Sequence, residues 1–94
     1  MGPNPIPVAT TAIPAVTAGH ANFQLTVEGS GFVPGAVVRW NGADRTTIFQ
    51  SDNVLIADIP ASDVATAGTV PVTVFNPPQG GGTSKKVNYV IAAK

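Results

Sequence analysis

The stretch Gly29-Ser30-Gly31-Phe32-Val33-Pro34-Gly35-Ala36-Val37-Val38-Arg39-Trp40-Asn41-Gly42 decides how this chain folds. It has the pattern of a strand end, a glycine-rich corner, a second strand and a turn. The corner glycines can adopt backbone angles that a residue with a Cβ resists, and Phe32 between them can close the end of a hydrophobic core. Val38 and Trp40 lie two residues apart and therefore share one face of a strand. Asn41-Gly42 is a strong signal for a hairpin turn.

The composition is typical of a small all-β domain. The 94 residues are 44% apolar and 11% charged, and their formal net charge is zero. Valine and threonine, which favour strands, are plentiful, and ten glycines and nine prolines supply turns. No apolar period of a helix persists through the chain. We therefore expect one all-β domain.

Charge and hydropathy exclude several classes of partner. Five lysines and arginines are scattered along the chain, so we expect no basic face for nucleic acid. No apolar run approaches the roughly 20 residues that a membrane span needs, so we expect no membrane insertion. The chain has no cysteine, which excludes disulfides and zinc–thiolate sites.

Alternation of apolar and polar residues predicts a two-sheet sandwich. Four segments carry apolar residues at every second position, so each directs one face to a core. Their inward residues are Phe23, Leu25 and Val27; Leu55, Ala57 and Ile59; Val70, Val72 and Val74; and Val87, Tyr89 and Ile91. An edge strand at 8–13, a strand at 36–40 and a threonine-rich strand at 44–50 complete the set. About seven short strands of this kind predict an immunoglobulin-like, antiparallel two-sheet β-sandwich.

The chain divides into a short extension and one domain. Residues 1–7 are rich in proline, and we expect them to form an extended linker or N-terminal extension. Residues 8–94 are expected to form the domain itself. Within it, residues 61–65 are expected to form a single helical turn capped by Ser62 or Asp63.

Five pieces of the sequence, in order, resemble the IPT/TIG family of immunoglobulin-like domains. They are Gly29-Ser30-Gly31-Phe32, Val38-Arg39-Trp40-Asn41-Gly42, Leu55-Ile56-Ala57-Asp58-Ile59-Pro60, Gly68-Thr69-Val70-Pro71-Val72-Thr73-Val74-Phe75-Asn76 and Gly80-Gly81-Gly82-Thr83-Ser84. The resemblance runs from about Ala12 to Ile91. It implies a bacterial-type IPT/TIG domain with the immunoglobulin fold.

The resemblance also implies a role. Domains of this family are non-catalytic modules of bacterial secreted and surface proteins, including multidomain enzymes, and of animal receptors and some transcription factors. We therefore expect a structural or interaction module, acting as a spacer or docking domain, in a larger secreted or cell-surface protein. The expected partners are neighbouring domains of that protein or another protein, and the isolated domain is expected to be monomeric.

The polar residues do not form a recognisable catalytic or metal motif. His20 is the only histidine and lies in a predicted turn, and no nucleophile or acid is spaced to form a triad with it. The four aspartates between residues 44 and 63 lack the spacing of a calcium loop and are typical of turns. We therefore expect no enzymatic activity, no cofactor and no metal site.

Two motifs near the C-terminus each have a functional interpretation and a purely structural one. Residues 80–85 superficially resemble a phosphate-binding loop, but the residues after them alternate as a strand instead of opening a helix, so a hairpin loop is the better interpretation. A lysine at 85 or 86 with Asn76 or Asn88 leaves open an internal lysine–asparagine cross-link. Because that reaction needs a buried lysine beside a carboxylate, solvated edge charges are the better interpretation.

Three aromatic residues leave a carbohydrate-binding alternative open. Trp40, Phe49 and Phe75, if exposed together, would stack on sugar rings. Trp40 shares the phase of Val38, which predicts that it packs in the core. Phe75 shares a face with Pro71 and Thr73, which predicts that it points outward. A carbohydrate-binding accessory module of an extracellular enzyme is therefore the alternative function.

The same alternation predicts one contact surface. In the immunoglobulin arrangement, the strands that carry Val38, Val74 and Tyr89 are neighbours in one sheet. Their outward residues would then form a docking face of aromatic, aliphatic and arginine side chains, a mixture that is enriched at interfaces. The residues of this face are Val37, Arg39, Thr73, Phe75, Asn88 and Val90.

Overall fold

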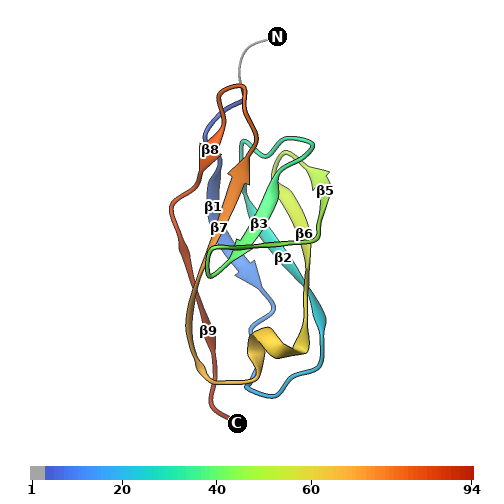
Figure 1. Cartoon of the computed structure of the whole chain (residues 1–94), viewed down its shortest axis with the longest axis vertical. Helices are drawn as coiled ribbons and strands as arrows, with labels where there is room; N and C mark the ends of the chain where they lie inside the picture. The colour runs from blue at the N-terminus through green and yellow to red at the C-terminus, as the bar shows by residue number, and fades with distance from the viewer. Residues whose placement is uncertain (1–3) are drawn as a thin grey trace.

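The computed structural model describes residues 4–94, which form two antiparallel sheets packed face to face (Figure 1). The four-stranded sheet has the order β1 (Val8–Ile13), β2 (Phe23–Ser30), β6 (Val54–Ile59) and β5 (Thr47–Ser51). The five-stranded sheet has the order β4 (Ala43–Arg45), β3 (Val37–Trp40), β7 (Gly68–Asn76) and β8 (Gly82–Thr83), with β9 (Val87–Ile91) also paired to β7. The predicted all-β, immunoglobulin-like sandwich is confirmed.

The core lies between the two sheets and consists mainly of the alternating rows that the sequence indicates. The residues of these rows that are at most 4% exposed are Leu25, Val27, Val38, Trp40, Leu55, Ala57, Ile59, Val72, Val74, Tyr89 and Ile91. Phe23, Val70 and Val87 are only half-buried: Phe23 and Val87 are the first residues of their strands, and Val70 lies two residues after the start of β7. Side chains at every second position reach the core because successive residues of a strand point to opposite faces.

The glycine-rich corner closes one end of this core. Phe32 is 2% exposed, and its backbone N–H donates to the carbonyl of Asp52 over 3.0 Å. Gly31 precedes it at φ +73°, a conformation that costs a residue with a Cβ free energy. The predicted hairpin turn also forms, with Asn41 at φ 51° and Gly42 at φ 86°. Two successive positive φ values are typical of a type I′ turn.

The single strand predicted at residues 44–50 is wrong, because the chain changes sheet within it. β4 pairs with β3 in the five-stranded sheet, and β5 pairs with β6 in the four-stranded sheet. Thr47 lies at the crossing, where its hydroxyl accepts from the N–H of Val38 over 2.9 Å and donates to the carbonyl of Arg45 over 2.8 Å. A side chain thus replaces a backbone partner, and the chain can leave the ladder without leaving the Val38 donor unpaired.

The predicted helical turn is present as the 3₁₀ helix η1 (Ala61–Val64), but its predicted cap is wrong. The residue before the helix is Pro60, and no side chain caps it. The carboxylate of Asp63 binds Arg45 instead. Val64 is fully buried and fills the end of the core opposite Phe32.

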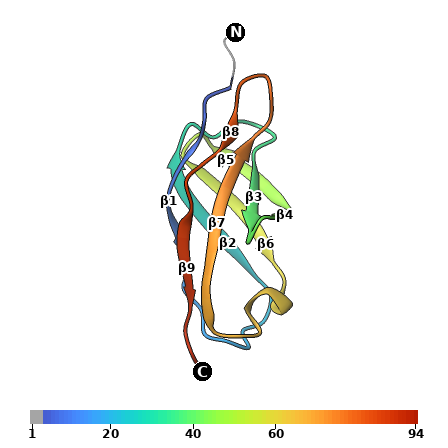
Figure 2. The same ribbon diagram turned by 60° about the vertical axis from the view of Figure 1, so that its left-hand side comes forward.

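The two ends of the described chain lie at opposite ends of an elongated domain (Figures 1 and 2). Its principal extents are 47 × 20 × 18 Å. Asn4 pairs with the β7–β8 loop, where its N–H donates to the carbonyl of Gln79 over 2.7 Å, and Pro7 is fully buried. Residues 4–7 of the predicted extension are therefore held against the domain, and residues 1–3 lie outside the described residues. In the part of the chain that the structure describes, no helix is long and apolar enough to cross a membrane.

Candidate functional site

Four of the six predicted docking residues form a compact group on the outer face of the five-stranded sheet. Val37 pairs directly with Phe75, and Arg39 pairs with Thr73, so the four side chains share one face of β3 and β7. The Arg39 guanidinium carbon lies 4.2 Å from the centre of the Phe75 ring. Its Nε also lies 2.9 Å from Oδ1 of Asp44. We call Val37, Arg39, Thr73 and Phe75 the β3–β7 cluster.

The other two predicted docking residues lie further along the same sheet. Asn88 pairs with Pro71, and Val90 pairs with Thr69. Thr69 is four residues from Thr73 along β7, which corresponds to about 13 Å at the rise of an antiparallel strand. Val90 is 57% exposed. The structure therefore places all six residues on the predicted face but separates Val90 from the β3–β7 cluster, with Asn88, opposite Pro71, between them.

The three aromatic residues considered for carbohydrate binding do not come together on one strand pair, because Phe49 is 37% exposed on β5 of the four-stranded sheet and Phe75 lies on β7 of the other. Trp40 is 4% exposed and packs against Tyr89, with ring centres 5.2 Å apart. Phe75 lies on the outer face under Arg39. Trp40 is therefore unavailable for stacking on a sugar, and Phe49 and Phe75 belong to different sheets.

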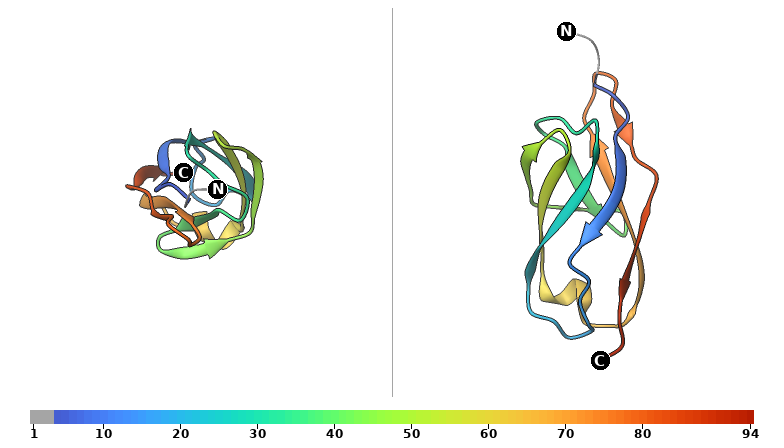
Figure 3. Two further views of the ribbon diagram at one scale, coloured as in Figure 1. Left: turned by 90° about the horizontal axis from the view of Figure 1, so that it is seen from above. Right: turned by 180° about the vertical axis from the view of Figure 1, so that it is seen from behind.

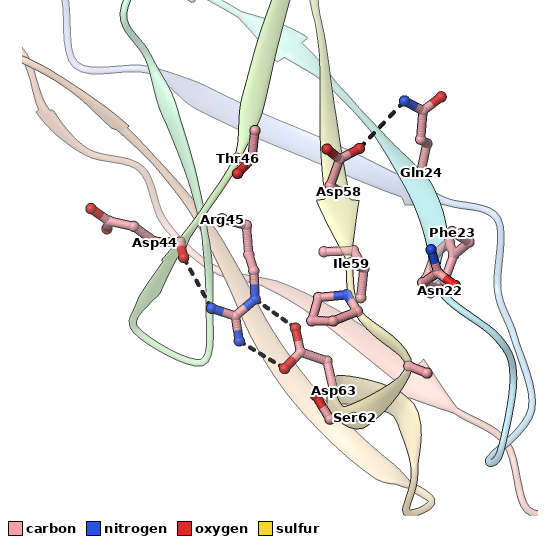
Figure 4. Close-up of a pocket in the computed structure, with 12 residues that line it drawn as sticks. Asn22, Phe23, Gln24, Asp44, Arg45, Thr46, Asp58, Ile59, Ser62 and Asp63 are labelled. Atoms are coloured by element: carbon pink, nitrogen blue, oxygen red, sulfur yellow. Dashed lines mark hydrogen bonds and ion pairs between the residues drawn. The ribbon is translucent and has the colours of Figure 1, made fainter.

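A polar groove between η1 and the crossing from β4 to β5 contains a charged pair joined by two hydrogen bonds (Figure 4). Arg45 Nε lies 2.5 Å from Oδ2 of Asp63, and Nη2 lies 2.7 Å from Oδ1. Its Nη1 donates to the carbonyl of Asp44 over 2.9 Å. The hydrogen bond to Asp63 raises the pKa of Arg45, so the guanidinium stays charged.

This pair has a structural role that the sequence spacing does not reveal. It joins the crossing between the two sheets to η1, segments 18 residues apart. Three of the five guanidinium N–H groups already have partners within the domain, which fixes the side chain between the crossing and η1. Across the groove, Asp58 accepts from Gln24 Nε2 over 3.4 Å, as Figure 4 shows.

The remaining polar candidates are scattered. His20 is exposed, its Nδ1 lies 2.7 Å from the carbonyl oxygen of Ala21, and its ring meets the edge of Phe23. Among residues 4–94, no three or more histidine, cysteine, aspartate or glutamate residues gather closely enough to hold a metal ion. Lys85 and Lys86 are both exposed. Residues 82–83 form β8 on the edge of β7, as the hairpin interpretation predicts.

Asn76 is a second structural residue whose role the sequence does not reveal. It is fully buried, and its Nδ2 donates to the carbonyl of Pro5 over 2.9 Å and to that of Gly31 over 2.7 Å. One side chain thus ties the N-terminal segment to the glycine-rich corner. An asparagine beside prolines and glycines is typical of a turn, so the sequence alone does not indicate that Asn76 is buried.

Tyr89 gives the domain a predictable response to alkaline pH. Burial raises the pKa of its hydroxyl, which donates to the carbonyl of Pro14. A tyrosine whose folded pKa is raised contributes stability in full below about pH 10, its ordinary pKa, and that contribution is lost as pH rises through the folded value. We expect Tyr89→Phe to cost about 1 kcal/mol at neutral pH, from the lost hydrogen bond, and to lack this alkaline loss.

Denaturant unfolding between pH 8 and 11 checks this expectation. The quantity to compare is the difference in free energy of unfolding between the wild type and Tyr89→Phe. The stability gap between the wild type and Tyr89→Phe should narrow or reverse above about pH 10. Lysine titration is common to both proteins and cancels in the difference. A gap that stays constant over the whole range would contradict the raised pKa.

Comparison with known proteins identifies the family. A sequence profile described as the IPT/TIG domain matches residues 7–91. The fold is similar to the solution structure of the TIG domain from human nuclear factor of activated T-cells, cytoplasmic 4, with a TM-score of 0.69 and 16% sequence identity over 94% of this chain and 89% of that chain. A comparison with curated proteins found no match. The chain therefore belongs to the IPT/TIG domain family, whose members are non-catalytic structural and interaction modules.

Proposed function

We propose that this domain is a spacer and docking module, of the bacterial type, in a larger secreted or cell-surface protein. The observation that carries the proposal is the position of the chain ends. Asn4 is bonded to the β7–β8 loop at one end of the 47 Å axis. At the other end, the N–H of Ala18 donates to the carbonyl of Ala92 over 2.8 Å. Because both ends are fixed to the body, the domain can hold two neighbours apart in a defined geometry.

This spacer role predicts a narrow distribution of distances between the two neighbouring domains. We would fuse a small spin-labelled reporter domain to each end and measure the distance between the labels by pulsed electron paramagnetic resonance. The control replaces the domain with a Gly/Ser linker of equal length, whose r.m.s. span of roughly 50 Å is similar but whose distribution is broad. The domain should give one narrow peak at a distance longer than its 47 Å axis. A broad distribution, or a short distance from reporters folded back along the sides, would contradict the proposal.

The proposed docking surface is the β3–β7 cluster. Asn88 and Val90 of β9 extend it along the same face, toward the start of β7. An aromatic ring, an aliphatic side chain and an arginine are enriched at protein interfaces. Arg39 is already held by Phe75 and Asp44, so little side-chain entropy remains to be lost when a partner binds. The proposed partner is a neighbouring domain of the same protein or another protein.

A further inference from the structure

A row of apolar side chains crosses the outer face of the four-stranded sheet. Direct cross-strand pairs join Ile13 of β1 to Thr26 of β2, Thr26 to Ile56 of β6, and Ile56 to Ile48 of β5. Directly paired residues lie on the same face of a sheet, so these four side chains form one continuous line. The right-hand view of Figure 3 shows this side of the molecule, with β1 and β2 toward the viewer. We call Ile13, Thr26, Ile56 and Ile48 the isoleucine row.

The isoleucine row faces solvent. Along β2 and β6 the neighbours of its residues, Val27, Leu55 and Ala57, are fully buried between the sheets, so the row points away from the core. Ile13 is 48% exposed and Ile48 is 50% exposed. Exposed single apolar residues are ordinary, but a line of three isoleucines and a threonine methyl across a whole sheet is a contiguous apolar patch of the kind that marks interaction sites.

Acidic residues flank the row on both sides. Two residue pairs further along the strands, on the same face, the carboxylate of Glu28 accepts from the hydroxyl of Thr11 over 2.9 Å. On the other side of the row, Asp58 pairs with Gln24. The four strands of this sheet contain these two acids and no lysine or arginine. The zero net charge of the chain therefore conceals a face that is apolar in the middle and negative at both margins.

This charge pattern decides which occupant fits. If two copies of the domain met row to row about a two-fold axis, the acidic margins of one copy would face the acidic margins of the other. Like charges brought together at an interface cost free energy and suppress such pairings. A partner with basic margins would instead gain complementary contacts along both sides of the row. We propose that the isoleucine row is a docking site for a protein surface that presents an apolar ridge flanked by lysine or arginine.

This site is independent of the β3–β7 cluster, because it lies on the other sheet. A module with one docking face on each sheet can be held between two partners. The two faces also differ in chemistry, since the β3–β7 cluster carries an arginine paired with Asp44 and the isoleucine row is flanked by Glu28 and Asp58. They are therefore expected to select different partners.

The test uses a pair of designed probes that differ in charge alone. The first probe is a disulfide-closed β-hairpin peptide with isoleucines on one face and lysines along both flanks, and the second has glutamate in place of each lysine. Each is titrated into the ¹⁵N-labelled domain while amide shifts are recorded. We expect the lysine hairpin to bind at least about tenfold more tightly, to shift the amides of the isoleucine row, and to weaken as salt is added.

Matched variants test whether the lysine hairpin binds at the isoleucine row. Ile13→Thr with Ile48→Thr changes two exposed residues, so the fold should be retained, and binding of the lysine hairpin should weaken about tenfold. Ile6→Thr makes the same change at an exposed isoleucine of the N-terminal segment, outside both proposed docking faces, and should bind as the wild type does. Glu28→Gln with Asp58→Asn should reduce the preference for lysine over glutamate.

Three results would overturn the proposal. One is that neither hairpin shifts the row at millimolar concentration, and another is that both bind equally well. The third comes from analytical ultracentrifugation of the domain alone. Self-association that Ile13→Thr with Ile48→Thr abolishes would assign the row to a second copy of the chain and not to a basic partner.

Discussion

Phe32→Ala is expected to lower the free energy of unfolding by about 3–5 kcal/mol, the usual cost of deleting a buried phenylalanine. The ring is 2% exposed and closes one end of the sandwich, where the strands of both sheets converge on the glycine-rich corner. The corner backbone is fixed by hydrogen bonds to the carbonyls of Asp52 and Asn53, so it cannot collapse easily into the space left by the ring. The loss would be a large share of the roughly 5–15 kcal/mol that stabilises a domain.

Urea unfolding followed by the fluorescence of Trp40 measures this loss. Phe32→Leu keeps most of the apolar volume and should cost about 1 kcal/mol. Phe49→Ala is a matched control. Phe49 is 37% exposed on the edge strand β5, so this substitution should lower the free energy of unfolding far less than Phe32→Ala does. If Phe32→Ala costs below about 1 kcal/mol, the corner is not part of the core and the packing described for it is incorrect.

Gly29→Ala is expected to have the second-largest effect, about 3 kcal/mol, at the upper end of the cost of overpacking. A Cβ at Gly29 would lie 1.8 Å from the carbonyl oxygen of Val8 and 2.9 Å from Cζ of Phe32. The first of these atoms is backbone, so no change of rotamer relieves the clash. The start of β1 would have to separate from β2, with loss of the pairing between Ala9 and Gly29.

Gly42→Ala separates this steric effect from the general cost of replacing a glycine. Gly42 has φ +86°, and a Cβ there would meet no atom within 4 Å. Its replacement should therefore cost only about 1–2 kcal/mol, from the left-handed conformation. Thermal unfolding of both variants gives the comparison. Equal losses in the two variants would show that the close approach of β1 to Gly29 does not limit stability.

The core could be predicted from the sequence because period-two alternation records which side of each strand is buried. Val72, Val74 and Tyr89 follow this rule, and Phe32 is identified by the glycines around it. The crossing from β4 to β5 could not be predicted in this way. Residues 44–50 keep a strand-like composition on both sides of Thr46, and the change of sheet depends on a hydrogen bond from Val38 to the hydroxyl of Thr47.

The surfaces could be predicted only in part. The alternation of apolar and polar residues shows which face a side chain occupies, but it does not show which residues of neighbouring strands pair. Phase correctly places Val37 and Phe75 on one outward face, but pairing separates Val90 from them. The isoleucine row likewise depends on the registers of four strands. One of these includes an irregularity between Ala9 and Thr11, which sets Ile13 opposite Thr26. The pair of Arg45 and Asp63 has no sequence signal, because contact between residues 18 apart arises only when the sheets pack.

The central claim is that this domain acts through its sheet faces and not through the polar groove. The most direct test compares the amide spectrum of the ¹⁵N-labelled domain alone with its spectrum within the larger protein in which we propose that it acts. Shifts should concentrate on the β3–β7 cluster, and Phe75→Ser should remove them. Shifts centred on Arg45, Asp58 and Asp63, with the sheet faces unchanged, would contradict the claim and make the groove the functional site.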